Sequence, residues 1–149
     1  MENQNINWKW LNILYKYNAY TLISTGTAMI LFPDLFKSIL GIPKQDPFFF
    51  GVISCVWFTF GLLSALGIKS PLKFIPVLMM QLCYKTIWLT FIALPTFISG
   101  FHPFYSVLLI ICMLSYVILD VIAIPFGYLF AEETHTDNMT GAVRSQHLY

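Results

Sequence analysis

The sequence predicts an all-α integral membrane protein, a four-helix transmembrane bundle, and three observations support this fold class. Hydrophobic residues make up 58% of the 149 residues and charged residues only 10%, against about 45–50% and about 25% in an ordinary soluble domain. The apolar residues occur in blocks close to the roughly 20 residues that cross a bilayer as a helix. No segment between the blocks is long enough to build a soluble catalytic domain.

The first helix is expected at about residues 10–32. It starts among Trp8 and Lys9, and aromatic rings and lysines of this kind lie at the headgroup level of a bilayer. A short surface helix is expected next, at residues 34–40, with Asp34 as its N-cap and Gly41 after its last turn. Its apolar side chains share one face, which favours a helix lying flat on the membrane.

Three more apolar blocks predict helices at about residues 48–68, 72–95 and 104–130. Together with the first helix they are expected to form a single transmembrane domain, residues 1–130. The remaining residues, 131–149, are polar and predict a cytoplasmic tail.

The basic residues of the short loops predict the orientation of the helices. The larger group falls on one side and consists of Lys9, Lys16, Lys69, Lys73 and Arg144. Lys37 and Lys44 fall on the other side. Because basic residues favour the cytoplasmic side, we expect a multi-pass protein of the cell membrane with both termini in the cytoplasm.

Two opposite charges lie inside predicted membrane-spanning helices. Lys85 is near the middle of the third helix, and Asp120 lies within the fourth. A charge at the bilayer centre costs roughly 2.5–3.5 kcal/mol even on the translocon-derived scale, so such residues pair with each other or face a polar cavity. Helical side chains lean toward their own N-terminus. In antiparallel neighbours Lys85 and Asp120 therefore lean toward each other, and we expect an ion pair.

Helical periodicity places further polar and aromatic residues beside these charges. The candidate ligand-binding residues share one face of the third helix and one face of the fourth, and they are Gln81, Tyr84, Lys85, Trp88, Tyr116 and Asp120. Such faces belong inside the bundle, because lipid would not satisfy their polar atoms.

Three interpretations of these residues remain open. The Lys85–Asp120 pair fixes the register of the helices, or it lines a polar site for a lipid headgroup or a quinone-like small molecule, or it couples transport to protons or ions. The leading hypothesis is a binding or accessory membrane protein with an intrabundle polar site around Lys85 and Asp120. A redox or quinone-interacting enzyme subunit is the alternative, and a coupled small-molecule transporter is the second alternative. Four short helices would need to form a homo-oligomer, or join a membrane complex, to make a transport path.

The sequence offers little sign of catalysis. It contains no recognisable catalytic motif, so we favour a protein that is not an enzyme, and the cofactor stays unknown. Cys55, Cys83 and Cys112 fall in three different predicted helices without CxxC spacing. The acidic and histidine residues at 132–137 predict a solvated tail rather than a metal site. The net charge of +1 gives no sign of a nucleic-acid partner.

The first seventy residues or so also resemble a known family. The shared pattern consists of Gly26, Phe32-Pro33, Leu40-Gly41-Ile42, Gly51, Gly61-Leu62-Leu63 and Leu66-Gly67. In this pattern the chain is similar to the DoxX-like group of small four-helix membrane proteins. The resemblance implies a compact bundle in a bacterial inner membrane, in a group sometimes tied to membrane redox complexes. Many members carry an acidic residue in the second helix, where this chain has Trp57 and no acid.

Overall fold

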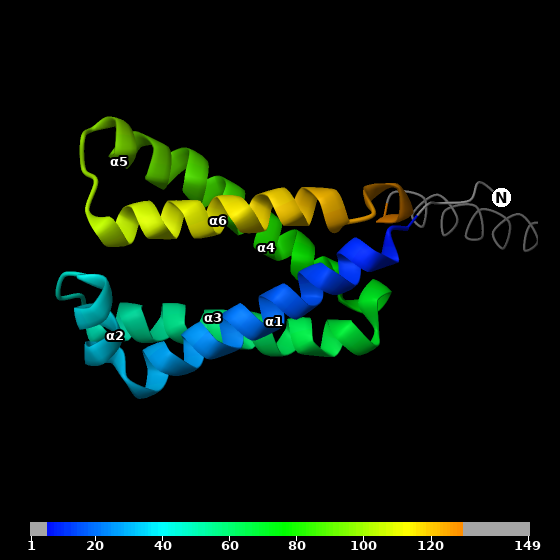
Figure 1. Ribbon diagram of the computed structural model, residues 1–149, viewed down its shortest axis with the longest axis horizontal. Helices are drawn as coiled ribbons and strands as arrows, with labels where there is room; N and C mark the ends of the chain where they lie inside the picture. Colours follow the sequence, from blue (N-terminus) through cyan, green and yellow to red (C-terminus); the bar gives the residue numbers. More distant parts are fainter. Residues whose placement is uncertain (1–5, 130–149) are drawn as a thin grey trace, which may run out of the picture. The chain divides into compact units, whose positions relative to one another are not determined.

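The computed structural model describes residues 6–129, whose regular structure is entirely helical (Figure 1). The helices are α1 (Trp8–Leu31), α2 (Pro33–Leu40), α3 (Pro47–Lys69), η1 (Pro71–Phe74), α4 (Ile75–Trp88), η2 (Leu89–Ala93), α5 (Leu94–Ile98) and α6 (Phe104–Ala123). The predicted all-α membrane fold is confirmed. Contacts separate a helical unit, Lys9–Ile124, from a second unit that includes Pro125. The helical unit thus ends before the expected boundary at residue 130, and the tail at 131–149 lies outside the described residues.

Within residues 6–129, three continuous helical segments are long and apolar enough to cross a bilayer: Pro47–Lys69, Pro71–Ile98 and Phe104–Ala123. A fourth span is reached only when α1 and α2 are taken together, and the chain bends by 112° between them. Apolar side chains also cover the outside of the helices, and Phe48 and Ile98, for example, are 83% and 75% exposed. Such surfaces fit the hydrocarbon of a lipid bilayer rather than water.

The helix α1 packs closely against α3 because glycines let the two backbones approach. A Cβ atom on Gly26 would lie 2.7 Å from the backbone nitrogen of Phe58, and one on Gly61 would lie 2.7 Å from that of Ile23. Small residues at such positions are typical of helix pairs in membranes, where close packing replaces the hydrophobic effect. The two contacts also fix the register of α1 on α3.

The helix α2 starts one residue earlier than predicted, and its N-terminus differs from the prediction. Pro33 occupies the first turn, and no side chain of the described residues caps the helix. Asp34 lies inside that turn and forms an ion pair with Lys37 at 2.9 Å, so its predicted role as N-cap is wrong. The C-terminus is as expected: Gly41 has φ +68°, and the amide of Ile42 donates to the carbonyl of Lys37 at 2.9 Å.

The third span does not end at Pro95. The helix continues through a π-helical turn, η2, and on to Ile98. Proline has no amide hydrogen, and its ring conflicts with the carbonyl four residues before it in a regular α-helix. The wider π turn shifts the hydrogen-bond pattern just before Pro95, so that the amide of Leu94 donates to the carbonyl of Leu89. The span then ends near Gly100, whose φ is +88°.

The last span is shorter than predicted. α6 ends at Ala123, so the expected helix at 104–130 is wrong at its C-terminal end. Ile124 has extended backbone angles, as expected for a residue before a proline. In the second unit the amides of Tyr128 and Leu129 donate to the carbonyl of Pro125, at 3.0 and 3.4 Å, and form a separate turn.

Candidate functional site

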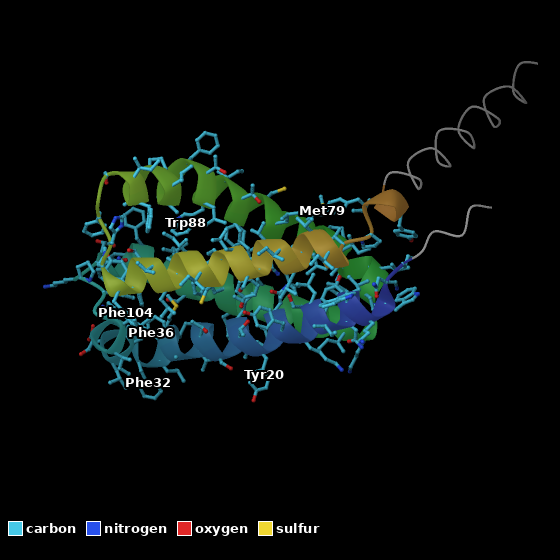
Figure 2. All side chains as sticks on the ribbon, turned by 45° about the horizontal axis from the view of Figure 1, so that its top comes forward. Tyr20, Phe32, Phe36, Met79, Trp88 and Phe104 are labelled. Atoms are coloured by element: carbon cyan, nitrogen blue, oxygen red, sulfur yellow. The ribbon has the colours of Figure 1, made fainter. Side chains whose placement is uncertain are left out.

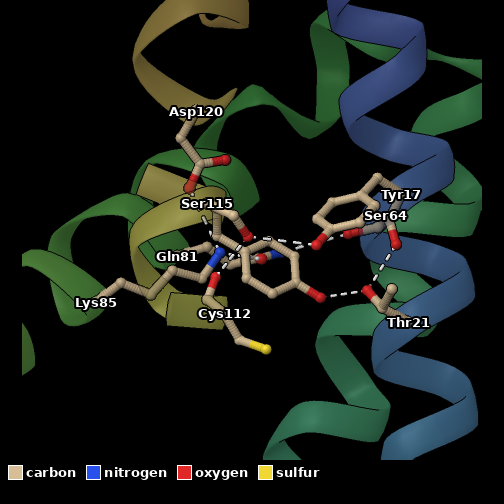
Figure 3. A network of polar contacts seen from close by, with 9 residues as sticks. Tyr17, Thr21, Ser64, Gln81, Lys85, Cys112, Ser115 and Asp120 are labelled. Atoms are coloured by element: carbon tan, nitrogen blue, oxygen red, sulfur yellow. Dashed lines mark hydrogen bonds and ion pairs between the residues drawn. The ribbon is translucent and has the colours of Figure 1, made fainter. Parts of the chain in front are cut away.

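A buried polar cluster connects α3, α4 and α6 (Figure 3). The Nζ atom of Lys85 lies 3.4 Å from Oδ2 of Asp120 and 3.1 Å from Oε1 of Gln81. The Nε2 atom of Gln81 donates in turn to Oγ of Ser64 on α3, at 3.3 Å. All four residues are completely buried. The predicted ion pair between Lys85 and Asp120 is therefore confirmed.

The surroundings of Lys85 compensate its buried charge from three directions. Asp120 supplies the opposite charge, and Gln81 supplies a neutral acceptor. The ring of Tyr116 lies 4.1 Å from Nζ, measured to its centroid, within the range of a cation–π interaction. Removing an ion from water costs several kcal/mol, and this cost is offset only where the partners are close and the hydrogen bonds are made. The arrangement therefore stabilises both charges as one unit.

Tyr116 also connects this cluster to α1. Its hydroxyl forms a hydrogen bond with Oγ1 of Thr21, and Thr21 donates to the backbone carbonyl of Tyr17 at 2.6 Å (Figure 3). The ring of Tyr116 lies 4.8 Å from that of Tyr17, and the Tyr17 hydroxyl lies 3.3 Å from Oγ of Ser115. Interactions of one tyrosine thus extend from the ion pair to the first helix.

Several buried polar atoms have no hydrogen-bond partner within the described part of the chain. They are Oδ1 of Asp120, the hydroxyl of Tyr84, and both Oδ1 and Nδ2 of Asn18. The Tyr84 ring stacks on Phe60, with centroids 5.7 Å apart and the planes 12° from parallel. Buried polar groups are normally paired with protein, water or ligand. These four atoms are exceptions to that pattern.

A cavity of about 440 Å³ lies against the Tyr84 and Tyr116 side chains. Residues of α1, α2, α3, α4 and α6 line it, and most of its wall is apolar. The polar groups in the wall come from tyrosines, threonines, Gln45, Trp57 and Cys112, and none of the described residues that line it is charged. Ligand pockets typically measure about 300–1,000 Å³ and combine an apolar wall with a few polar groups. The cavity has the size and chemistry of a small-molecule site.

The six predicted site residues separate into three groups. Gln81, Lys85 and Asp120 form the sealed cluster and are not part of the cavity lining. Tyr84 and Tyr116 line the cavity. Trp88 is half-buried at the end of α4, outside the cavity lining (Figure 2). Whether any of the six binds a ligand stays a prediction.

Sequence reasoning missed several residues of this region. Ser64 and Asn18 are completely buried polar residues inside apolar segments, and Trp57 lines the cavity. Ser64 lies between Gly61 and Gly67 in steps of three residues, and all three are buried on α3. That spacing of small residues is a signal that could have placed Ser64 on the packed face.

The described residues hold no group of three or more His, Cys, Asp or Glu side chains arranged for a metal ion. The residues at 132–137 lie outside the described part. Cys55, Cys83 and Cys112 are free and exposed, and Cys112 lines the cavity.

No family model matches this sequence, and the searches of curated proteins and of solved structures found no match either.

Proposed function

We propose that this is a membrane protein of the binding or accessory type, which holds an amphipathic molecule from the bilayer in the cavity beside Tyr84 and Tyr116. The observation that carries the proposal is the cavity itself, about 440 Å³ in volume and lined by apolar side chains with tyrosine and threonine hydroxyls. A molecule with an apolar body and a small polar head would match both parts of this wall.

The Lys85–Asp120 pair has a supporting role in this proposal. Both residues are completely buried, and Lys85 already has an acid, an amide oxygen and an aromatic ring as partners. A proton-coupled transporter needs a hydrated route to the group that exchanges protons, so this burial favours binding over coupled transport. The pair holds Tyr116 in place and with it one wall of the cavity.

The proposed setting is a lipid bilayer, with both termini in the cytoplasm. The exposed apolar side chains on the helices support the bilayer, and the excess of lysines on one side supports the orientation. On the basis of the resemblance to the DoxX-like group, we propose that this bilayer is a bacterial inner membrane. A quinone-like head group is one that would form hydrogen bonds with the tyrosine hydroxyls. A role as a partner in membrane redox chemistry is therefore a related function.

Mass spectrometry of the protein extracted in lipid nanodiscs or mild detergent tests the proposal. Cys112→Phe should fill the cavity, because Cys112 lines it. The matched control is Ile111→Phe on the same helix, since Ile111 is 59% exposed on the outside. We expect wild type and Ile111→Phe to retain the same small molecule and Cys112→Phe to lose it. Equal retention by both variants, or an empty wild type, would contradict the proposed function.

A further inference from the structure

We infer that one end of the helical unit is a binding surface for anionic phospholipid headgroups, formed by four exposed lysines. These residues, called the lysine patch below, are Lys9 and Lys16 of α1, Lys69 at the end of α3, and Lys73 of η1. The surface is separate from the cavity and does not depend on the function proposed for it. Three observations carry the inference: a contact of α1, the distribution of charge, and the apolar side chains beside the lysines.

Tyr15 holds the first turns of α1 against the turn between α3 and η1. Its completely buried ring occupies the space in which a side chain at Gly67 would lie. Its hydroxyl donates to the backbone carbonyl of Pro71 at 2.7 Å. Figure 1 shows the start of α1 and the turn between α3 and η1 at the same end of the helical unit.

The four lysines are grouped around this contact. Lys16 directly follows Tyr15, and Lys9 lies two helical turns earlier on the same face of α1. Lys69 and Lys73 lie two residues before and two residues after the carbonyl that Tyr15 contacts. All four are exposed, so their ammonium groups are available to a partner outside the chain.

The lysine patch has no acidic neighbour at its own end among residues 6–129. Asp120 lies on the helix that ends there, but it is completely buried and paired with Lys85. At the opposite end of the helical unit, two lysines are matched by two aspartates: Lys37, Lys44, Asp34 and Asp46. Positive charge is therefore uncompensated at one end of the described chain and balanced at the other.

The side chains next to the lysines favour a lipid over a soluble acidic partner. Ile13, which is 39% exposed, lies between Lys9 and Lys16 on the same face of α1. Leu66, which is 52% exposed, lies one turn before Lys69 on α3. Exposed apolar side chains that lead directly to lysines are typical of helices that leave the hydrocarbon at headgroup level. Clusters of basic residues at that level attract anionic headgroups.

Native mass spectrometry of the purified full chain in detergent tests this inference. The protein is titrated with phosphatidylglycerol, which is anionic, or with phosphatidylcholine of the same acyl chains, which is zwitterionic. Two double variants remove two charges each from the lysine patch: Lys9→Gln with Lys16→Gln, and Lys69→Gln with Lys73→Gln. Lys37→Gln with Lys44→Gln is the matched control, because it removes two charges from the opposite end.

The design separates the lysines from other effects. Detergent solution has no sidedness, so a variant cannot change its affinity by changing its orientation in a membrane. The acidic residues outside residues 6–129 are the same in every variant, and so is the cavity lining. Lys69→Arg with Lys73→Arg keeps the charge and should keep the binding. Exposed lysines contribute little to stability, and thermal unfolding of each variant checks this.

We expect wild type to bind phosphatidylglycerol at least about tenfold more tightly than phosphatidylcholine. Each double variant of the lysine patch should weaken phosphatidylglycerol by about five- to 25-fold, since one lysine near an anionic surface contributes about fivefold. The affinity for phosphatidylcholine should stay unchanged. The control double variant should match wild type with both lipids.

Three results would overturn the inference. Equal affinity of wild type for the two lipids would remove the preference for anionic headgroups and favour an acidic soluble partner for the lysines. Unchanged binding of phosphatidylglycerol by both variants of the lysine patch, or an equal loss in the control, would show that the preference arises elsewhere. A loss in the arginine variant as large as in the glutamine variant would show that charge is not its cause.

Discussion

The ammonium group of Lys85 lies 4.1 Å from the centroid of the Tyr116 ring, so the buried ion pair and the cavity share one side chain. Tyr116 contacts Lys85 through its ring and Thr21 through its hydroxyl. A change at the ion pair therefore affects both the stability of the bundle and the shape of the cavity wall. Stability and ligand binding need to be measured separately for every variant in this region.

Loss of one member of the ion pair should be strongly destabilising. Lys85→Met leaves Asp120 as an uncompensated buried charge, and Asp120→Leu does the same to Lys85, which typically costs about 3–5 kcal/mol. The double variant should recover much of this loss, because an apolar pair has no charge to desolvate. A double-mutant cycle of unfolding in detergent measures the coupling. Strictly additive losses would show that the two charges do not stabilise each other.

Small-to-large changes at the contact between α1 and α3 should be costly. Gly26→Ala and Gly61→Ala place a methyl group 2.7 Å from a backbone nitrogen of the other helix, and such overpacking typically costs about 1–3 kcal/mol. Gly51→Ala is the matched control, because nothing lies within 4 Å of its added Cβ. It should be neutral or gain up to about 1 kcal/mol from better helix propensity. Equal effects at the three positions in thermal unfolding would argue against the close contact.

Two tyrosine-to-phenylalanine changes should have different effects on stability. Tyr116→Phe removes the hydrogen bond to Thr21 and should cost about 1 kcal/mol. Tyr84→Phe removes a buried hydroxyl that has no partner in the described residues, so the ligand-free protein should be unchanged or more stable. Denaturation of protein stripped of lipid by detergent exchange measures both. A large loss from Tyr84→Phe in that state would mean that its hydroxyl is already paired.

The ion pair could be predicted from the sequence because it depends on few assumptions. Two charges in neighbouring apolar helices must compensate each other, and the lean of helical side chains brings Lys85 and Asp120 together. This held although the expected end of the fourth helix was wrong: α6 ends at Ala123, close after Asp120, and not near residue 130. A buried charge needs a partner so strongly that the prediction of the ion pair did not depend on the exact end of the fourth helix.

The cavity could not be predicted in the same way. Periodicity within one helix identifies a face, but the cavity is formed by five helices whose crossing depends on backbone contacts such as that between Gly26 and Phe58. Trp88 shares the predicted face with Tyr84 yet lies outside the cavity lining. Thr21 lines the cavity and forms a hydrogen bond with Tyr116, which lies 95 residues away in the sequence.

Reporter fusions test the orientation. A reporter placed after Lys44 and another after His102 should both be external, because the larger group of lysines then lies in the cytoplasm. The two positions follow α2 and the third span, so they test different crossings. A cytoplasmic signal at either position would overturn the proposed topology.

Asn18 gives the most direct test of the unpaired polar atoms. It is completely buried on α1, and neither end of its amide has a partner in the described residues. An unpaired amide in an apolar interior costs free energy, about 1–3 kcal/mol in mutational data. Asn18→Leu, of similar size, should therefore raise the free energy of unfolding in detergent by about 1 kcal/mol or more.

The same substitution at Asn12, which is exposed on the same helix, serves as the control. It should change stability little, since its amide already lies at the surface. If Asn18→Leu instead lowers stability while Asn12→Leu does not, the Asn18 amide must hold a partner in the membrane-embedded protein. A water molecule or a bound ligand at Asn18 would then explain why a polar side chain is buried there.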